Sequence, residues 1–294
     1  MPRVCIGVPV YNSESLLEQC LENLAAQTFA DFKVIILDNA STDRTGAVAE
    51  RFAARDPRFS YRRQPQNKGA LQNFIDVLAL ADTPYFLWRA DDDVSDANYL
   101  EELVRLLDTN QDAALAVGVS VMDKRGRRRR TRFPSRWSGE PDASYRVRLL
   151  LISRAPWMYG VFRTADLRES FARVMSNYSY FYAFDHLVLF PFLVSLRVVG
   201  SNATSFITGF VERAVPQIKR GFIDPDQMLT ERNAFVRYCR EETLRLVPSA
   251  TSRAALWPAL AIYAERCYRW SKILSARRRV RAGETPTGAT KKYD

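Results

Sequence analysis

Three adjacent aspartates, Asp91-Asp92-Asp93, directly follow the apolar run Tyr85–Trp88. Carboxylates this close repel one another, so three of them at the end of a buried strand cost free energy unless positive charge or solvent compensates them. Their hard oxygen ligands suit Mg²⁺ or Mn²⁺, and such an ion can bridge the oxygens of a diphosphate and stabilise it as a leaving group. A solvated acidic turn before the next helix is the alternative, and the triplet alone does not decide between the two.

Polar residues also stand at three other places where an apolar run ends or a helix begins. An aromatic ring such as Tyr11 could stack on a nucleotide base, and Asp38 or Asn39 could accept a hydrogen bond from uracil or guanine. Lys68 and Gly69 place a cation and a flexible turn before a helix, where an anion is favoured. Taken singly, each segment is equally explained as an ordinary loop with helix caps. The three segments together comprise Pro9, Val10, Tyr11, Asn12, Asp38, Asn39, Asn67, Lys68 and Gly69.

Strand and helix patterns alternate through the first hundred residues. The runs rich in β-branched and aromatic residues predict strands. Residues between them carry apolar side chains at helical spacing, and Asn12-Ser13 is expected to cap the first helix. Repeated units of this kind favour an α/β fold with a mostly parallel sheet, helices on both faces and ligands at the carboxyl ends of the strands. The predicted strands are Val4–Val10, Phe32–Leu37, Phe59–Arg62 and Tyr85–Trp88.

Over residues 3–107 the chain resembles family 2 glycosyltransferases of the GT-A fold. The resemblance is carried by the order and spacing of Pro9-Val10-Tyr11-Asn12, Gln27-Thr28-Phe29, Leu37–Asp43, Asn67-Lys68-Gly69 and the aspartate triplet. It implies a GT-A-like, Rossmann-type sheet flanked by helices. It also implies that Tyr11 and Asp38 or Asn39 hold the base of a nucleotide-sugar donor.

The same resemblance makes the triplet similar to the Asp-x-Asp element of the family. Asp91 or Asp92 would then face the ribose and Asp93 the metal, although three aspartates allow two frames and Asp91 is also a candidate metal ligand. Two positions depart from the family pattern. Asp96-Ala97 stands where a proline is common, and Arg89 where many members have an acidic or small residue.

Inverting transfer also needs a base that deprotonates the acceptor hydroxyl. Tyr182–Leu187 resembles the family segment that supplies it, with Phe184 in place of the usual glutamate, so Asp185 is the candidate base and a helix N-cap is its alternative role. His186, the only histidine, could contact phosphate, metal or acceptor, or be structural. Trp157–Arg163 resembles the segment beside the acceptor, which makes Trp157, Tyr159 and Gly160 candidate acceptor residues, with core packing as the alternative.

Charge is distributed unevenly. Residues 1–110 contain 11 Lys/Arg and 17 Asp/Glu, whereas residues 111–294 contain 32 and 16. Eight of the thirteen residues of Lys124–Arg136 are basic, and Arg277–Arg281 follows an expected amphipathic helix. Basic clusters without interleaved aromatic residues or a recognised module argue against nucleic acid. They favour peripheral contact with an anionic membrane, with a solvated loop and packing of the helix on the catalytic domain as alternatives. The predicted stripe consists of Leu256, Trp257, Leu260, Tyr263, Cys267, Trp270 and Leu274.

Four segments are expected: a donor-binding half at 1–110, an acceptor-binding half of the same domain at 111–222, a helical extension at 223–282 and a disordered tail at 283–294. The sequence shows no signal peptide, no apolar run of about 18 residues that could span a bilayer, and four scattered cysteines. A cytoplasmic protein, peripheral at the inner face of the membrane, is the resulting expectation.

The combined prediction is an inverting, Mg²⁺- or Mn²⁺-dependent glycosyltransferase. It would use a UDP-sugar and a glycan or glycolipid acceptor in cell-surface polysaccharide or glycolipid assembly. A nucleotidyltransferase is a rival, but such enzymes usually have a glycine-rich basic loop after the first strand, where this chain has Tyr11–Glu14. A degenerate transferase that only binds lipid or partners is the non-enzymatic rival, against which the intact triplet and Asp185 argue.

Overall fold

The computed structural model describes residues 1–124, 127–180, 182–209 and 223–286. The chain divides into two compact units. The first, here called the sheet unit, comprises the described parts of Met1–Phe133, Arg154–Arg168 and Arg197–Arg213. The second, the helical unit, comprises the described parts of Pro134–Ser153, Glu169–Leu196 and Ala214–Asp294. Most of the expected tail, 287–294, lies outside the described residues.

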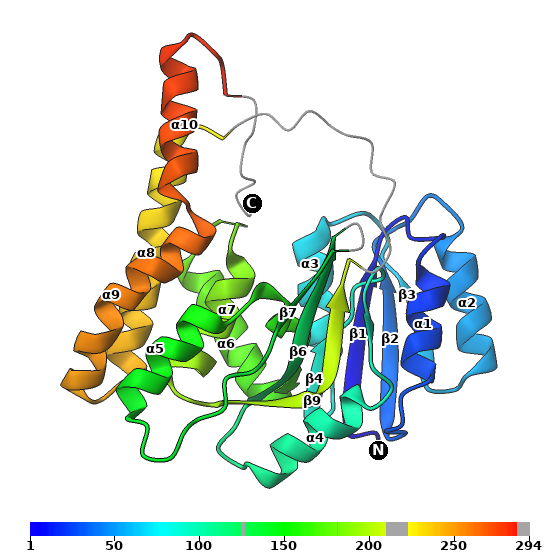
Figure 1. The fold of residues 1–294 in the computed structure, drawn as a ribbon. Helices are drawn as coiled ribbons and strands as arrows, with labels where there is room; N and C mark the ends of the chain where they lie inside the picture. The colour runs from blue at the N-terminus through cyan, green and yellow to red at the C-terminus, as the bar shows by residue number, and fades with distance from the viewer. Residues whose placement is uncertain (125–126, 181, 210–222, 287–294) are drawn as a thin grey trace. The chain divides into compact units, whose positions relative to one another are not determined.

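The N-terminal half of the sheet is entirely parallel. Its strands run in the order β3 (Phe59–Arg63), β2 (Phe32–Asp38), β1 (Val4–Val10) and β4 (Tyr85–Trp88) (Figure 1). Every residue of β1 and β4 is buried, as expected for strands covered by helices on both faces. The predicted α/β fold with a mostly parallel central sheet is confirmed.

The other half of the sheet mixes strand directions. β8 (Val161–Arg163) is antiparallel to both β4 and β6 (Leu115–Lys124), while β9 (Val198–Thr208) is parallel to β6. The short β5 (Val94–Ser95) and β7 (Arg127–Thr131) pair antiparallel with β9 and β6. Because Ser95 pairs with Phe206, β9 lies beside the segment that carries the aspartate triplet.

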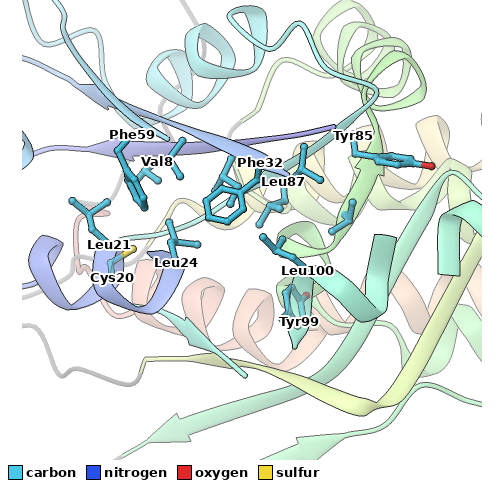
Figure 2. Packing of buried hydrophobic residues seen from close by; sticks show 14 of the residues in the cluster. Val8, Cys20, Leu21, Leu24, Phe32, Phe59, Tyr85, Leu87, Tyr99 and Leu100 are labelled. Carbon is cyan, nitrogen blue, oxygen red and sulfur yellow. The ribbon is translucent and has the colours of Figure 1, made fainter. Parts of the chain in front are cut away.

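Helices α1 (Leu17–Ala25), α2 (Thr45–Arg55), α3 (Ala70–Ala79) and α4 (Tyr99–Thr109) belong to the sheet unit. Figure 2 shows Leu21 and Leu24 of α1 among the buried side chains around Val8, Phe32 and Phe59. The predicted capping of α1 by Asn12-Ser13 is wrong. The helix begins at Leu17 without a side-chain cap, because Asn12 and Ser13 bond to other loops.

The remaining helices are α5 (Asp142–Ile152), the 3-10 helix η1 (Ala155–Tyr159), α6 (Thr164–Asn177), α7 (Phe184–Val194), α8 (Pro225–Leu246), α9 (Ala250–Cys267) and α10 (Trp270–Arg281). The predicted single helical stripe from Leu256 to Leu274 is wrong, because the helix breaks between Cys267 and Trp270. Four of its residues are buried, whereas Trp257, Trp270 and Leu274 are exposed. The buried residues are Leu256, Leu260, Tyr263 and Cys267. Among the described residues, no helix is both long enough and apolar enough to cross a bilayer.

A buried arginine holds the loop that carries the triplet. Arg89 follows β4 and is fully buried; its Nη1 donates to Asn23 Oδ1 (3.1 Å) and its Nη2 to Ser95 Oγ (2.7 Å). Asn23 Oδ1 also accepts from the Ser95 amide (2.9 Å), and the guanidinium lies 4.9 Å from the centre of the Phe206 ring. Burial lowers the pKa of Arg89, but an arginine remains charged at neutral pH. The two ends of segment 89–95 are thus tied to each other and to α1.

Replacing Arg89 by alanine should destabilise the sheet unit strongly. The change removes the hydrogen bonds from the Arg89 side chain to Asn23 and Ser95 and leaves Asp93 without the nearby positive charge. Removing one partner from a buried charged network costs about 3–5 kcal/mol. Urea denaturation followed by circular dichroism measures the free energy of unfolding. Arg105→Ala, an exposed arginine paired with Glu102 on α4, is the matched control and should change it by less than about 0.5 kcal/mol. Equal losses in both variants would contradict the role of Arg89.

Candidate functional site

The predicted donor residues gather at one edge of the sheet unit. Tyr11 and Asn12 follow β1, Asp38 ends β2, and the triplet follows β4. These strands are parallel neighbours, and Val10 pairs directly with Asp38, so their carboxyl ends meet at the same edge. Asn67-Lys68-Gly69 joins this edge through hydrogen bonds to Asn39.

Asp38 is completely buried and fully hydrogen-bonded. Its Oδ1 accepts from the Ser41 amide (2.8 Å) and hydroxyl (2.5 Å). Its Oδ2 accepts from the Tyr61 hydroxyl (2.8 Å) and from Arg63 Nη1 (2.9 Å). A carboxylate offers about four acceptor positions, and all are in use. A nucleotide base could therefore bond to Asp38 only by displacing a donor, and Arg63, whose side chain is half-exposed, is the one in contact with solvent.

Sequence reasoning missed Tyr61 and Arg63. No local motif marks these two residues. They reach Asp38 because β3 is parallel to β2 and its register pairs Arg63 with Asp38. Burial raises the pKa of Tyr61, and the Asp38 carboxylate raises it further. The phenol therefore stays protonated and can donate its hydrogen bond.

Asn39 connects three loops at this edge. Its amide donates to the Val10 carbonyl (2.9 Å), and its side-chain nitrogen donates to Asn67 Oδ1 (2.9 Å) and to the Gly69 carbonyl (3.1 Å). Its side-chain oxygen accepts from the Lys68 amide (2.9 Å). Gly69 adopts φ 84°, which a side chain would disfavour. The Lys68 ammonium is paired with Asp76 at 2.8 Å.

Tyr11 is the open aromatic side chain at this edge, with 43% of its surface exposed. The following Asn12 has φ 51° and accepts a hydrogen bond from the Thr42 amide (2.8 Å), which fixes the loop that carries Tyr11. Pro9 and Val10 are buried within β1 and contribute backbone and packing.

The triplet has two buried carboxylates and a more open one between them. Asp91 and Asp93 are 5% and 4% exposed, whereas Asp92 is half-buried. Asp91 accepts a hydrogen bond from the Ser13 hydroxyl, and Asp93 Oδ1 accepts from the Gly209 amide (3.0 Å). Burial, with the charge of Asp92, raises the pKa of Asp93 to about 7. Sequence reasoning did not find Ser13 or Gly209 as partners of the triplet.

The chemistry of the triplet fits a divalent cation. Among the described residues no three His, Cys, Asp or Glu side chains already converge as a metal cage. Mg²⁺ in phosphate sites usually takes only one or two protein carboxylates and completes its shell with phosphate oxygens and water. The raised pKa of Asp93 shows that its negative charge is poorly compensated in the protein, as expected of a carboxylate that needs a cation.

Asp185 and His186 lie in the helical unit, in the first turn of α7. Asp185 is half-buried, and its Oδ1 accepts from the His186 amide (2.9 Å). The His186 ring lies edge-on to Tyr263 of α9, with Nδ1 3.2 Å from the phenol oxygen, and the phenol is 2.9 Å from the His186 carbonyl. His186 thus has a packing role within this unit.

Of the three candidate acceptor residues in the sheet unit, two are explained by core packing. The Trp157 ring is 1% exposed and packs 5.6 Å from that of Phe133. A Cβ on Gly160 would lie 2.4 Å from the Ala116 carbonyl oxygen, so no side chain fits there. Tyr159, by contrast, is half-buried and stacks on Phe206 with ring centres 5.0 Å apart.

The basic run is partly a strand and not only a loop. Arg128, Arg129 and Arg130 are exposed on β7, which pairs with β6, and Arg128 forms an ion pair with Asp123 (2.9 Å). The side chains of residues 124–127 lie outside the described ones. In the helical unit, Arg277 is 3.4 Å from Asp226.

Comparison with known proteins agrees with this architecture. Residues 5–171 match the family model described as Glycosyl transferase family 2. GlyG of Streptococcus pneumoniae is 28% identical over 115 residues, which cover 39% of this chain and 38% of GlyG. The putative glycosyltransferase EpsH of Bacillus subtilis is 25% identical over 219 residues, covering 74% of this chain and 59% of EpsH. The chain therefore spans less than two thirds of the length of these relatives.

Solved structures share the fold. S. aureus TarS 1–349 in complex with UDP-GlcNAc has a TM-score of 0.65 and 18% identity, over 92% of this chain and 73% of that one. The mannosyltransferase PcManGT from Pyrobaculum calidifontis, with GDP-Man and Mn²⁺, has a TM-score of 0.58 and 16% identity, over 97% and 76%. Since the family model covers more than half of the chain, this protein belongs to glycosyl transferase family 2.

Proposed function

We propose that this chain transfers a sugar from a nucleoside diphosphate donor to a hydroxyl acceptor, with inversion at the anomeric carbon. The observation that carries the proposal is the joint placement of the exposed Tyr11 ring, the anchored Asp38 and Asn39, and the buried triplet at one sheet edge. A nucleotide-sugar site needs an aromatic ring that stacks on the base, hydrogen-bond acceptors for the base, and carboxylates that hold a metal and its diphosphate.

UDP is the proposed nucleotide. Among proteins with the same fold, TarS was solved with UDP-GlcNAc, whereas PcManGT was solved with GDP-Man. In this chain Tyr11 stacks on the base, and Asn39, or Asp38 once Arg63 is displaced, accepts its N–H. Pro9, Val10 and Asn12 shape the floor through their backbone, and Asn67-Lys68-Gly69 lies toward the phosphates.

The three aspartates of the triplet are proposed to contact the ribose and the metal. Asp91 or Asp92 bonds the ribose hydroxyls, and Asp93, with Asp91, would hold Mg²⁺ or Mn²⁺. When bound, the ion neutralises charge on the departing diphosphate. Arg89 keeps these carboxylates in place through Asn23 and Ser95.

Asp185 is proposed as the base. It takes the proton of the acceptor hydroxyl as the oxygen attacks the anomeric carbon opposite the diphosphate, which leaves with the bonding pair. The acceptor is proposed to be a glycan or glycolipid of cell-surface assembly, with Tyr159 beside it and Trp157, Gly160 and His186 in supporting positions. We retain 1–110 as the donor half, 111–222 as the acceptor half and 223–282 as the helical extension. A cytoplasmic location with peripheral contact at an anionic membrane completes the proposal.

Asp93→Asn should weaken Mn²⁺-dependent UDP binding more than about tenfold, because even second-shell changes at metal sites cost 10–100-fold. Isothermal titration calorimetry with UDP, with and without Mn²⁺, measures the dissociation constant. Asp82→Asn, an exposed aspartate paired with Lys33, is the matched control and should bind like the parent protein. An unchanged dissociation constant in Asp93→Asn would exclude Asp93 as a ligand, and absence of nucleotide binding by the parent protein with metal would end the donor-site proposal.

Asp185→Asn should lower kcat at least about a hundredfold, the usual contribution of a positioned base, while UDP affinity stays within about twofold. The assay is release of UDP from a UDP-sugar in the presence of a hydroxyl acceptor. Asp224→Asn is the control, because Asp224 is a helix-capping aspartate of the same unit and accepts from two backbone amides of α8. Normal turnover by Asp185→Asn would remove Asp185 as the base, and equal losses in both variants would point to a structural effect.

A further inference from the structure

The solvent-exposed face of α9 is mostly uncharged, with the partly exposed Glu265 at its C-terminal end. Its exposed residues recur at helical spacing, so they share one face of the helix, and the opposite face packs on α5 and α8. A surface helix ordinarily shows charged and polar residues on its outer side. The exposed residues are Ala250, Thr251, Ala254, Trp257, Pro258, Ala261 and Ile262. Trp257 and Ile262 are 39% and 53% exposed, so large apolar groups face outward.

The next helix, α10, adds positive charge to exposed apolar groups. Trp270 and Leu274 are 42% and 50% exposed and lie four residues apart. Arg277, Arg278 and Arg281 follow at the spacing that continues the same face. Trp270–Arg281 contains five basic residues and no acidic one.

Both helices are supported by the same partner. α9 and α10 each contact α8, and Figure 1 shows them following one another along it. The Trp270 ring is also held by Arg232 of α8, whose guanidinium lies 4.7 Å from the ring centre. The helical unit therefore presents one mostly apolar helix face on α9, followed by a cationic helix, α10, with an aromatic residue at its start.

This combination matches the interface of an anionic bilayer. Tryptophan and aliphatic side chains enter the boundary between headgroups and acyl chains, while arginines remain at the phosphates. A second copy of the chain is a poorer occupant, because it would bring a second α10 with five basic and no acidic residues to the same interface, whereas anionic lipid supplies the opposite charge.

We propose that α9 and α10 dock this protein on an anionic membrane surface. Trp257, Ile262, Trp270 and Leu274 insert into the interfacial layer, and the arginines of α10 bind lipid phosphates. The proposal names the surface for the peripheral contact suggested above and assigns it to α9 and α10 rather than to β7. It does not depend on sugar transfer.

Vesicle sedimentation with the full chain tests the charge requirement. The parent protein should bind vesicles of phosphatidylcholine with 30% phosphatidylglycerol, bind pure phosphatidylcholine much less, and dissociate as salt rises. Arg278→Gln with Arg281→Gln should weaken binding more than about tenfold, since each cation near the surface contributes roughly a factor of five to ten. Arg129→Gln with Arg130→Gln on β7 removes the same charge from the other basic segment and should bind like the parent protein.

Brominated phosphatidylcholine in the same anionic vesicles tests insertion, because bromine quenches nearby tryptophan. Quenching should fall in Trp257→Leu and in Trp270→Leu but persist in Trp137→Leu, a more exposed tryptophan outside α9 and α10. Circular dichroism confirms that each variant is folded. Equal binding to neutral and anionic vesicles, loss of binding only in the β7 variant, or no binding together with a concentration-dependent dimer would each overturn the proposal. UDP binding by the α10 variant should stay unchanged, which separates this result from failure of the donor site.

Discussion

Burial of acidic side chains at the end of β4 is the constraint on which this site depends. Asp91 and Asp93 are almost fully buried, and the free-energy cost of an uncompensated carboxylate grows as solvent is removed. Arg89 supplies a buried positive charge and ties Asn23 to Ser95, while Ser13 and the Gly209 amide donate to the carboxylates. Much of the local structure therefore compensates these charges, but the raised pKa of Asp93 shows that compensation is incomplete. A divalent cation would supply the remaining charge.

At the end of strand β2, the charge of a buried carboxylate is compensated in a different way. Asp38 is also fully buried, yet Arg63, Tyr61 and Ser41 fill all of its acceptor positions. Asp38 is thus saturated within the protein, whereas burial and the charge of Asp92 raise the pKa of Asp93. This contrast supports a rigid role for Asp38 in holding the base pocket and an active role for the triplet in binding a metal–diphosphate. The helical unit adds a different feature, the mostly apolar exposed face of α9 followed by the cationic helix α10.

How much could be predicted depended on the range of the interactions involved. The strands Val4–Val10 and Tyr85–Trp88 were predicted residue for residue, because short apolar runs rich in β-branched or aromatic residues are local signals. The parallel order then brought Tyr11, Asp38 and the triplet together as expected. Local pattern failed at Asn12-Ser13, where a capping motif was expected but Ser13 bonds to Asp91, 78 residues away. It failed again at the Leu256–Leu274 stripe, because helical spacing does not show that one helix ends at Cys267 and the next begins at Trp270.

The sequence by itself determined the alternation of strands and helices, the sheet edge at which polar residues meet and the acidic triplet, because each follows from residue type and short spacing. Only the tertiary structure decided what each of those side chains contacts. Tyr61 and Arg63 reach Asp38 through the pairing of β3 with β2, and Gly209 reaches Asp93 across 116 residues. Hydrogen bonds between buried charges link distant segments, and their partners are set by strand order and packing rather than by any local pattern.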